Sequence, residues 1–517
     1  MYPLKIGSAA QFKTLREFLS DAGYTEQAVC QRLGIPSIYE FKTLHEGRSG
    51  SSQISDRLDA LIRFFMDEEA VDHATLALQF EADALRVMEE LALIKRRSGD
   101  SDQWYADAVL YPQERLFIAS DRTFQVEKSK GASLPEDVVY ASITRNTGRF
   151  VSVLPSDPCG NFLDLCSGTG IGALIAGARY AQQAWACDLS GRCTHFADFN
   201  RRLNGIENVH AEQGDLYAPV EGLQFDRIVA HPPYVPAEEQ QLMFRDGGQD
   251  GEQILRGIVQ GLPRFLRPGG RFYTLTLATD REGETIEQRV RQWLGDAEAE
   301  FDVFLVFNEA ERRPNTILQA VVEAKGKLGE LGPRSKLYER LKVEAILYGV
   351  IVVERHQTMR APLTARGHKS RTAGSEIVEW FRNWQIAAAR PEFENMLLRA
   401  RPHPAAGFFL VVTHAAQEGS LRPVEFRARA NHELKSDARI EPWVAVLIGA
   451  CDGSKTVREL FGYLKEQEVI ATSMGLTEFS SVLKVLLESG FLEVPDFLLP
   501  PVKKTSAEAS ATVLQGS

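Results

Sequence analysis

The stretch FLDLCSGTGIGALIAGA, Phe162 to Ala178, decides the fold. Its first residues have the apolar character of a buried β-strand, and its last residues form an apolar helix. Between them, Gly168, Gly170 and Gly172 form a tight turn. Glycines let the backbone approach a ligand, and the next helix presents free N–H groups to it. We therefore expect a strand–turn–helix unit with a ligand at the turn.

An acidic residue in the strand indicates which ligand the turn binds. A glycine-rich turn alone would also fit a dinucleotide-binding site. A phosphate-binding loop is excluded, because no Gly-Lys-Ser follows the turn. Asp164 would repel a pyrophosphate, but it suits a ligand whose nearby end is an amino acid with a cationic amine. This favours S-adenosyl-L-methionine over a nicotinamide dinucleotide.

Two further acids follow at the spacing that this cofactor requires. A ribose needs acidic acceptors about 20 residues after the turn, at the end of the second strand, and Asp188 is there. Asp215 follows the third strand, where an acid or its neighbouring backbone can contact adenine. Each acid alone is more often a helix cap or a loop carboxylate, but three at successive strand ends predict a cofactor site. Its expected residues are Asp164, Cys166, Gly168, Thr169, Gly170, Asp188, Leu189, Asp215, Leu216 and His231.

The surrounding sequence predicts an α/β fold, because β-rich runs alternate with helical stretches from about residue 101 to 325. We expect a Rossmann-like sheet of seven strands in this domain. The candidate strands are residues 162–168, 184–190, 208–216, 225–234, 271–279, 302–308 and 317–325.

The flanking segments predict additional domains. Residues 1–100 have the apolar spacing of a helical or winged-helix-like domain. Residues 326–420 indicate an α+β region, with a helix over 335–349, a strand over 349–356, a helix over 375–384 and a strand over 408–413. Residues 421–497 resemble a winged helix, and residues 498–517 predict a disordered tail.

Composition narrows the class of protein. A length of 517 residues predicts three or four domains. A net charge of −11 and a pI near 5.6 argue against a surface that binds a polyanion throughout. The sequence has no long apolar run and no evident secretory signal, which predicts a cytoplasmic protein. The six cysteines form no CxxC pair, so we expect reduced thiols and no metal site.

The segment FDRIVAHPPYVP, Phe225 to Pro236, resembles the Asn-Pro-Pro-Tyr motif of class I S-adenosylmethionine-dependent amino-group methyltransferases. His231 replaces the Asn, and Pro232, Pro233 and Tyr234 follow. In that family the Asn oxygen and a carbonyl of the Pro-Pro pair hold a planar –NH2 group, while the aromatic ring stacks on the substrate. The resemblance implies that His231, Pro232 and Tyr234 are the catalytic residues.

A second stretch resembles the release-factor glutamine methyltransferases, in which a Gly-Gly-x-Asp-Gly sequence follows the motif. Gly247, Gly248, Asp250 and Gly251 match it here. The resemblance covers about residues 140–280 and implies that methyl is transferred to a nitrogen, with a protein glutamine side chain as the favoured acceptor.

The histidine in the motif leaves its role open. A neutral imidazole accepts a hydrogen bond through one nitrogen, and it also accepts a proton, which Asn does not. His231 is therefore either a hydrogen-bond acceptor, a general base for a hydroxyl or amine, or a residue that only shapes the pocket.

Other segments are weaker candidates for the site. Thr144, Arg145 and Thr147 are expected in a loop over the cofactor, and Trp104, Tyr105 and Tyr111 are either a substrate wall or core residues. Two basic segments are either solvated faces or sites for an acidic partner: Arg360, Arg366, Lys369 and Arg371, and Arg422, Arg427, Arg429 and Lys435.

The sequence therefore predicts a multidomain methyltransferase that uses S-adenosyl-L-methionine, with a protein partner as substrate. Three alternatives remain: a methyltransferase for nucleic-acid base amines, a small-molecule N- or O-methyltransferase, and a non-catalytic binding protein with the cofactor fold. No membrane association is expected, and the sequence indicates neither the oligomeric state nor the role of residues 326–420.

Overall fold

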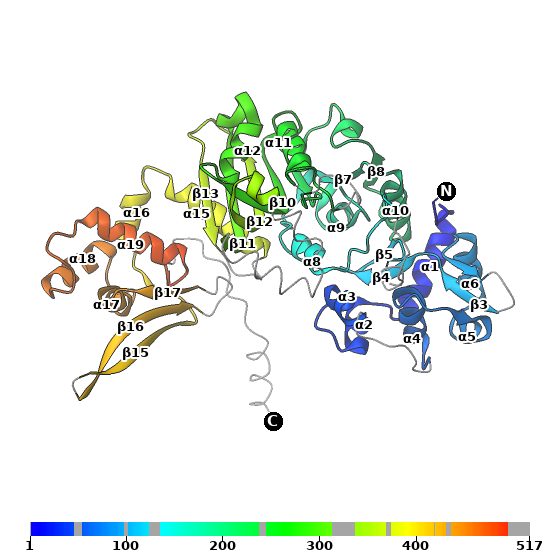
Figure 1. The fold of residues 1–517 in the computed structure, drawn as a ribbon, viewed down its shortest axis with the longest axis horizontal. Coiled ribbons are helices and arrows are strands. Elements are labelled where there is room, and N and C mark those ends of the chain that lie inside the picture. The colour runs from blue at the N-terminus through cyan, green and yellow to red at the C-terminus, as the bar shows by residue number, and fades with distance from the viewer. Residues whose placement is uncertain are drawn as a thin grey trace. The chain divides into compact units, whose positions relative to one another are not determined.

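The computed structural model describes residues 2–45, 54–97, 102–123, 135–236, 245–312, 337–368, 374–417, 419–430 and 436–494 (Figure 1). The chain divides into two compact units. The first comprises Met1–Val303 with Ala310–Pro362, and the second comprises Phe304–Glu309 with Leu363–Ser517.

A mixed β-sheet forms the centre of the fold. Its strand order is β13-β11-β12-β10-β9-β6-β7-β8. The strands β6, β7, β8 and β9 are parallel to their neighbours, and β10 is parallel to β9 and antiparallel to β12. The strands are β6 (Cys159–Leu165), β7 (Ala181–Asp188), β8 (Val209–Gln213), β9 (Phe225–Ala230), β10 (Leu266–Arg281), β11 (Phe301–Arg312), β12 (Val343–Arg355) and β13 (Thr364–His368).

The strand order reverses between β6 and β9, and this reversal positions the ligand site. From β6 the chain runs outward to β7 and β8, then returns to add β9 and β10 on the other side of β6. In such sheets ligands bind in the crevice at the carboxyl ends of the strands beside the reversal. The helices α9 (Ile171–Arg179) and α10 (Gly191–Leu203) pack on these strands. The predicted α/β Rossmann-like fold is therefore confirmed.

The sheet differs from the prediction at its antiparallel side. Among the described residues it has eight strands rather than the expected seven. The expected strand at 317–325 lies outside the described residues. The strand beside β10 is β12, although residues 335–349 had the spacing of a helix. The apolar run from Ile346 to Val353 pairs along the length of β10, and this pairing overrides the helical preference of Val343 to Ala345.

Helices and two small sheets precede the central sheet within the first unit. The sheets are β1-β3-β2 and the hairpin β4-β5. Asn200 of α10 bonds both the N–H and the carbonyl of Ala119 in β5, at 2.7 and 3.0 Å, which fixes the hairpin to the domain that follows. The elements are α1 (Ala9–Asp21), α2 (Glu26–Leu33), α3 (Phe41–His45), α4 (Arg57–Leu61), α5 (His73–Gln79), α6 (Ala82–Glu90), β1 (Val71–Asp72), β2 (Ile94–Arg96), β3 (Gln103–Ala106), β4 (Val109–Gln113) and β5 (Leu116–Ser120).

Three helices of the first unit flank the remaining parts of the sheet: α8 (Arg145–Ser152), α11 (Gln253–Phe265) and α12 (Ile286–Leu294). Helices α8, α11 and α12 all pack on β10, and α11 and α12 also pack on each other.

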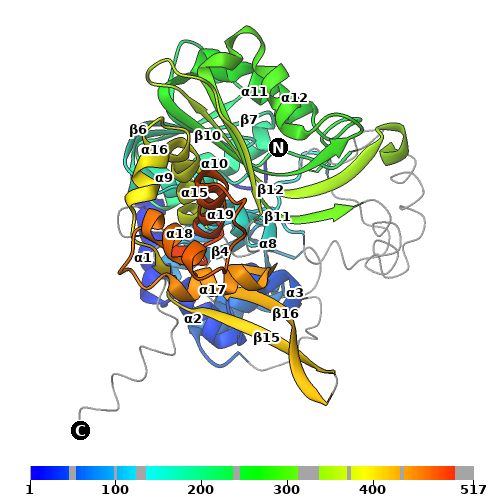
Figure 2. The same cartoon turned by 90° about the vertical axis from the view of Figure 1, so that its left-hand side faces the viewer.

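The second unit contains helices and a β-hairpin. The expected helix and strand at 375–384 and 408–413 are present within α15 and β15. The β15–β16 hairpin extends beyond α17, α18 and α19 in both views (Figures 1 and 2). The elements are α15 (Ser375–Ala388), α16 (Phe393–Arg399), β14 (His403–Pro404), β15 (Phe408–Gln417), β16 (Ser420–Ala430), β17 (Asp437–Ile440), α17 (Pro442–Ala450), α18 (Val457–Glu466), α19 (Leu476–Glu488) and β18 (Leu492–Glu493).

One predicted feature falls outside this description. The tail at 498–517 lies outside the described residues. Among the helices that are described, none has the length and apolar character needed to cross a membrane.

Candidate functional site

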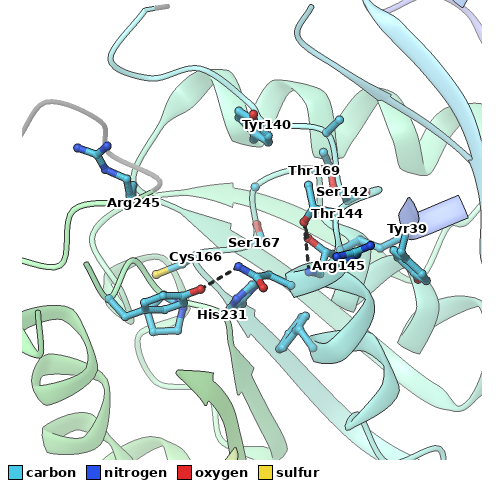
Figure 3. A pocket seen from close by; sticks show the side chains of 18 of the residues that line it. Tyr39, Tyr140, Ser142, Thr144, Arg145, Cys166, Ser167, Thr169, His231 and Arg245 are labelled. Carbon is cyan, nitrogen blue, oxygen red and sulfur yellow. Dashed lines mark hydrogen bonds between the residues drawn. The ribbon is translucent and has the colours of Figure 1, made fainter. Parts of the chain in front are cut away.

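Two adjoining cavities lie at the carboxyl ends of the central strands. The larger has a volume of about 540 Å³ and the smaller about 180 Å³. Four residues line both: Tyr140, Cys166, Gly168 and His231. A ligand that enters one cavity can therefore extend into the other past the glycine turn. Figure 3 shows the larger cavity and the side chains around it.

The turn after β6 has the backbone geometry that its glycines predict. Gly168 and Gly170 have φ values of +54° and +81°, and Cys166 also has a positive φ of +56°. A Cβ on Gly170 would lie 2.9 Å from the Cβ of Ala197 in α10. Gly170 itself lines neither cavity, so its part is to shape the turn.

Asp164 lies beneath the turn, with only 2% of its surface exposed. Its Oδ2 accepts a hydrogen bond from the N–H of Ala173 at 3.1 Å, and a Cβ on Gly172 would come 2.6 Å from the same oxygen. Burial raises the pKa of Asp164 to about 7, although the bond from Ala173 opposes the shift. A cationic group in the larger cavity would favour its charged form.

Asp188 ends β7 and links the second strand to the turn. Its carboxylate accepts the N–H of Gly168 at 2.9 Å and the N–H of Ser190 at 3.0 Å. Burial raises the pKa of Asp188, and these two bonds oppose the rise. A carboxylate has about four acceptor sites, so the side chain that holds the turn also retains sites for ligand hydroxyls.

The structure brings the other predicted cofactor residues around the same cavities. Leu189, Asp215 and Leu216 line the smaller cavity with Asp188, and Thr169 lines the larger. Leu216 has a positive φ of +46°, which turns the chain directly after Asp215. Cys187 and Cys193 also line the smaller cavity, and burial raises the pKa of both, so they are neutral thiols.

His231 follows directly on β9 at the junction of the cavities. Its ring stacks on Phe150 of α8, with centroids 5.2 Å apart and planes at 16°. Burial lowers the pKa of His231 to about 4, so the imidazole is neutral near pH 7. Its Nε2 is buried and has no hydrogen-bond partner among the described residues. A buried polar atom of this kind usually has a partner, which a ligand can supply.

The glycine-rich stretch that resembles the glutamine methyltransferases packs on the backbone of the motif. The N–H of Gly247 donates to the carbonyl of Val235 at 2.8 Å. A Cβ on Gly247 would come 2.6 Å from the carbonyl oxygen of Pro233 and 3.0 Å from the Cα of Tyr234. A Cβ on Gly251 would come 2.7 Å from the carbonyl oxygen of Tyr234. Small residues are therefore required for this contact.

Asp250 of this stretch stabilises the local backbone. Its carboxylate accepts the N–H of Glu252 at 3.0 Å and pairs with Arg256 at 2.5 Å. These contacts fix the entrance to α11 and thereby the glycine loop in front of it.

Several residues that line the larger cavity belong to no recognisable sequence motif. Tyr39, Lys42 and Thr43 come from the N-terminal region, Tyr140 and Ser142 come from the segment before α8, and Asn146 comes from α8. Figure 3 shows Tyr39 and Tyr140 around this cavity together with His231 and the turn residues. Tyr39 and Lys42 belong to a segment more than 100 positions from the glycine turn, so no local spacing could have indicated them.

The predicted loop over the cofactor is largely the beginning of a helix. Thr144 is the N-cap of α8 and accepts the N–H of Thr147 at 3.3 Å. Arg145 pairs with Glu40 through Nε at 2.9 Å. All three candidates line the larger cavity, but capping and ion pairing already account for their positions.

The aromatic cluster divides between core and surface sheet. Tyr111 is fully buried in β4, and its hydroxyl accepts the N–H of Ser142 at 2.8 Å, which supports the cavity wall from behind. Trp104 and Tyr105 belong to β3 and line neither of the two cavities. The core interpretation fits Tyr111, whereas Trp104 and Tyr105 are half-buried.

None of the described residues of the two basic segments lines either cavity. Arg360 pairs with Asp302, and Arg427 and Arg429 pair with Asp437 at 2.7 Å. Arg366 and Arg422 also have interactions, whereas Lys369, Arg371 and Lys435 lie outside the described residues.

Comparisons with known proteins support the resemblance over one part of the chain. Residues 139–303 match the family described as "Methyltransferase small domain". The release factor glutamine methyltransferase of Moorella thermoacetica is 33% identical over 149 residues, which cover 26% of this chain and 52% of that protein. The ribosomal protein uL3 glutamine methyltransferase of Bradyrhizobium diazoefficiens is 32% identical over 158 residues, which cover 28% of this chain and 49% of that protein.

A solved structure is also similar to part of the chain. The ribosomal protein L11 methylase of Lactobacillus delbrueckii subsp. bulgaricus is 21% identical, with a TM-score of 0.22, and covers 39% of this chain and 71% of that one. The chain spans about half the length of the two curated relatives. Residues 139–303 therefore match a methyltransferase domain, and the predicted similarity of this part of the chain to the glutamine methyltransferases is confirmed.

Proposed function

We propose that this chain is an S-adenosylmethionine-dependent methyltransferase that methylates a glutamine side-chain nitrogen of a protein partner. The observation that carries the proposal is the position of His231. It lines both cavities, and the same cavities are lined by the three acids of the predicted cofactor site and by Tyr234. A methyl group held at the turn would face an acceptor held by the His-Pro-Pro-Tyr motif.

The residues of the cavities fit the proposed cofactor. Asp164 in the larger cavity suits its cationic amine, and Asp188 has acceptor sites left for the ribose hydroxyls. Leu189, Asp215 and Leu216 provide apolar contacts and a polar edge for adenine in the smaller cavity. The bound cofactor supplies a methyl group that is already activated on a sulfonium.

His231 acts as a hydrogen-bond acceptor in this proposal. Its lowered pKa leaves the ring neutral, so one nitrogen can accept a hydrogen from the acceptor –NH2 group. A carbonyl of the Pro232–Pro233 pair accepts the other hydrogen, and proline cannot offer a competing N–H at that point. Two acceptors on one planar amide nitrogen draw its lone pair toward the incoming methyl. The methylated nitrogen would be strongly acidic, so it would give up one of its two protons to water without a dedicated base.

The remaining work of the site is alignment. Because the methyl donor is activated, the rate depends mainly on holding the nucleophile, methyl and sulfur in a line. The packing of the glycine loop on Pro233 and Tyr234 restricts the motif backbone, and the stack of Phe150 on His231 restricts the imidazole. A burial that lowers the pKa of His231 also makes the ring a weak general base, which favours the acceptor role over proton abstraction.

The proposed substrate class rests on the similarity to glutamine methyltransferases that are named for a release factor and for ribosomal protein uL3. The N-terminal region, which supplies Tyr39 and Lys42 to the larger cavity, is the part of the chain proposed to bind such a protein. A translation-related acceptor also fits the predicted cytoplasmic location.

The direct test is to incubate a cell lysate with the enzyme and methyl-labelled S-adenosylmethionine, and then to divide the sample between protease and nuclease. Label released by protease alone supports the proposal. Label released by nuclease would instead support a nucleic-acid base amine as acceptor, and label in a small-molecule fraction would support that class of substrate. The Asp188→Ala variant is the control for label that other enzymes of the lysate incorporate.

A further inference from the structure

The hydroxyl group of Tyr234 is held by a side chain outside the motif. The amide Nδ2 of Asn146 donates to the Tyr234 oxygen at 3.1 Å. The hydroxyl of Tyr348 in turn donates to Oδ1 of the same amide at 3.5 Å. One amide therefore joins the two tyrosines, and it comes from the first turn of α8.

The two tyrosine rings also contact each other. Their centroids are 6.4 Å apart and the planes meet at 68°, an edge-to-face arrangement. The guanidinium of Arg149, one turn after Asn146 on α8, lies 5.2 Å from the centroid of the Tyr348 ring. Burial raises the pKa of both tyrosines, so both hydroxyls stay protonated at neutral pH.

These contacts join three segments that are far apart in the sequence. Asn146 and Arg149 come from α8, Tyr234 from the motif after β9, and Tyr348 from β12. Residue 348 lies beyond the segment 139–303 that matches the methyltransferase family. Strand β12 thus contributes a side chain next to the motif. In this motif the imidazole of His231 stands in place of the asparagine amide.

We propose that Asn146 and Tyr348 are positioning residues that fix the ring of Tyr234 through its hydroxyl group. This positioning role rests on the proposed function, because the ring of Tyr234 would contact the planar amide group of the methyl acceptor. A ring tied at one end only by its backbone can rotate, whereas a bond to its hydroxyl restricts it before the substrate arrives. Preorganisation of this kind raises the rate of an alignment-limited reaction.

A double-mutant cycle between Asn146 and Tyr234 tests the coupling. We expect Asn146→Ala to lower kcat for the methyl acceptor about fivefold, the effect of losing one hydrogen bond. In the Tyr234→Phe background the same substitution should change kcat by less than about 1.5-fold, because the hydroxyl it acts through is gone. Asn146→Asp should restore most of the activity, since a carboxylate accepts a bond from the tyrosine. Independent, multiplicative effects in the cycle would overturn the proposal.

A spectroscopic measurement separates this proposal from the proposed function. In protein labelled with 3-fluorotyrosine, the ¹⁹F resonance that disappears in Tyr234→Phe belongs to Tyr234. Asn146→Ala and Tyr348→Phe should shift or broaden it. Ser152→Ala, on the same helix and lining neither cavity, should leave it unchanged. An unmoved resonance in Asn146→Ala overturns the positioning role even if the enzyme methylates glutamine. If no glutamine is methylated, the proposed function fails and this measurement still decides the contact.

Discussion

His231 and Phe150 form a stacked pair, with ring centroids 5.2 Å apart and planes at 16°. Phe150 is 3% exposed and covers one face of the imidazole, which contributes to the burial that lowers the pKa of His231 to about 4. The pair therefore keeps the residue that replaces the motif's asparagine in its neutral form. This form can accept a hydrogen bond but is poorly suited to holding a proton.

The first prediction concerns the role of His231. If the imidazole only accepts a hydrogen bond, His231→Asn retains kcat within about tenfold, whereas His231→Ala loses about a hundredfold, on the scale of a lost hydrogen bond to the reacting group. Steady-state kinetics at saturating cofactor measures both. Equal losses in the two variants would contradict the acceptor role.

The pH dependence of kcat gives the second prediction. With a pKa of about 4, the imidazole stays neutral as pH falls through its ordinary range, so kcat should show no inflection from His231 near about pH 6.5. In Phe150→Ala, water reaches the ring and its pKa should rise toward the ordinary value. The kcat of that variant should therefore decline as pH falls below about 6.5. A wild-type inflection near that pH, absent in His231→Asn, would show a titrating base instead.

The third prediction concerns Asp164, whose pKa is raised rather than lowered. Its pKa of about 7 lies above the usual 3.8, so the ligand-free site holds a proton below neutral pH. A cationic amine favours the carboxylate, and binding must then release that proton. Affinity for S-adenosylmethionine should weaken by up to about tenfold per pH unit below about pH 7 and level off above it.

Calorimetry over that pH range checks the dependence on Asp164. The Asp164→Asn variant should bind more weakly and lose the slope, because no proton is released from this position. The same raised pKa lowers the stability of the ligand-free protein as pH rises from about 4 to about 7, since the unfolded chain gives up the proton first. A slope that persists in Asp164→Asn would assign the proton to another group.

The fourth prediction concerns the glycine loop. A Cβ on Gly247 would come 2.6 Å from the carbonyl oxygen of Pro233, so Gly247→Ala must displace the motif backbone. We expect kcat to fall about a hundredfold, the scale of a 1 Å misplacement, while affinity for the cofactor changes less than about threefold. Gly449→Ala is the matched control, because nothing lies within 4 Å of its added Cβ and its backbone is helical. Unchanged kcat in Gly247→Ala would contradict the packing role.

The clustering of the residues proposed to hold the cofactor was predictable from the sequence, because these residues follow one rule. Asp164, Asp188 and Asp215 lie at the carboxyl ends of three consecutive strands, and parallel strands bring such ends together whatever else the chain does. Their spacing in the sequence therefore corresponds to proximity in the structure.

The surroundings of the His-Pro-Pro-Tyr motif were only partly predictable from the sequence. His231 to Tyr234 form one continuous motif, but Asn146 and Tyr348 contact it from other elements and carry no local signature. The strand that holds Tyr348 was itself missed over its first residues, where the pattern indicated a helix. Its register against β10 depends on long-range pairing, which periodicity in a short window does not reveal.

The central claim is that a glutamine nitrogen receives the methyl group held beside His231. The most direct measurement is mass spectrometry of protein fractions after incubation with the enzyme and trideuteromethyl-labelled S-adenosylmethionine. We expect a trideuteromethyl group on the side-chain nitrogen of a glutamine, present with the wild-type enzyme and strongly reduced with Asp188→Ala. A label found only on nucleic-acid bases, on small molecules or on other side chains would contradict it.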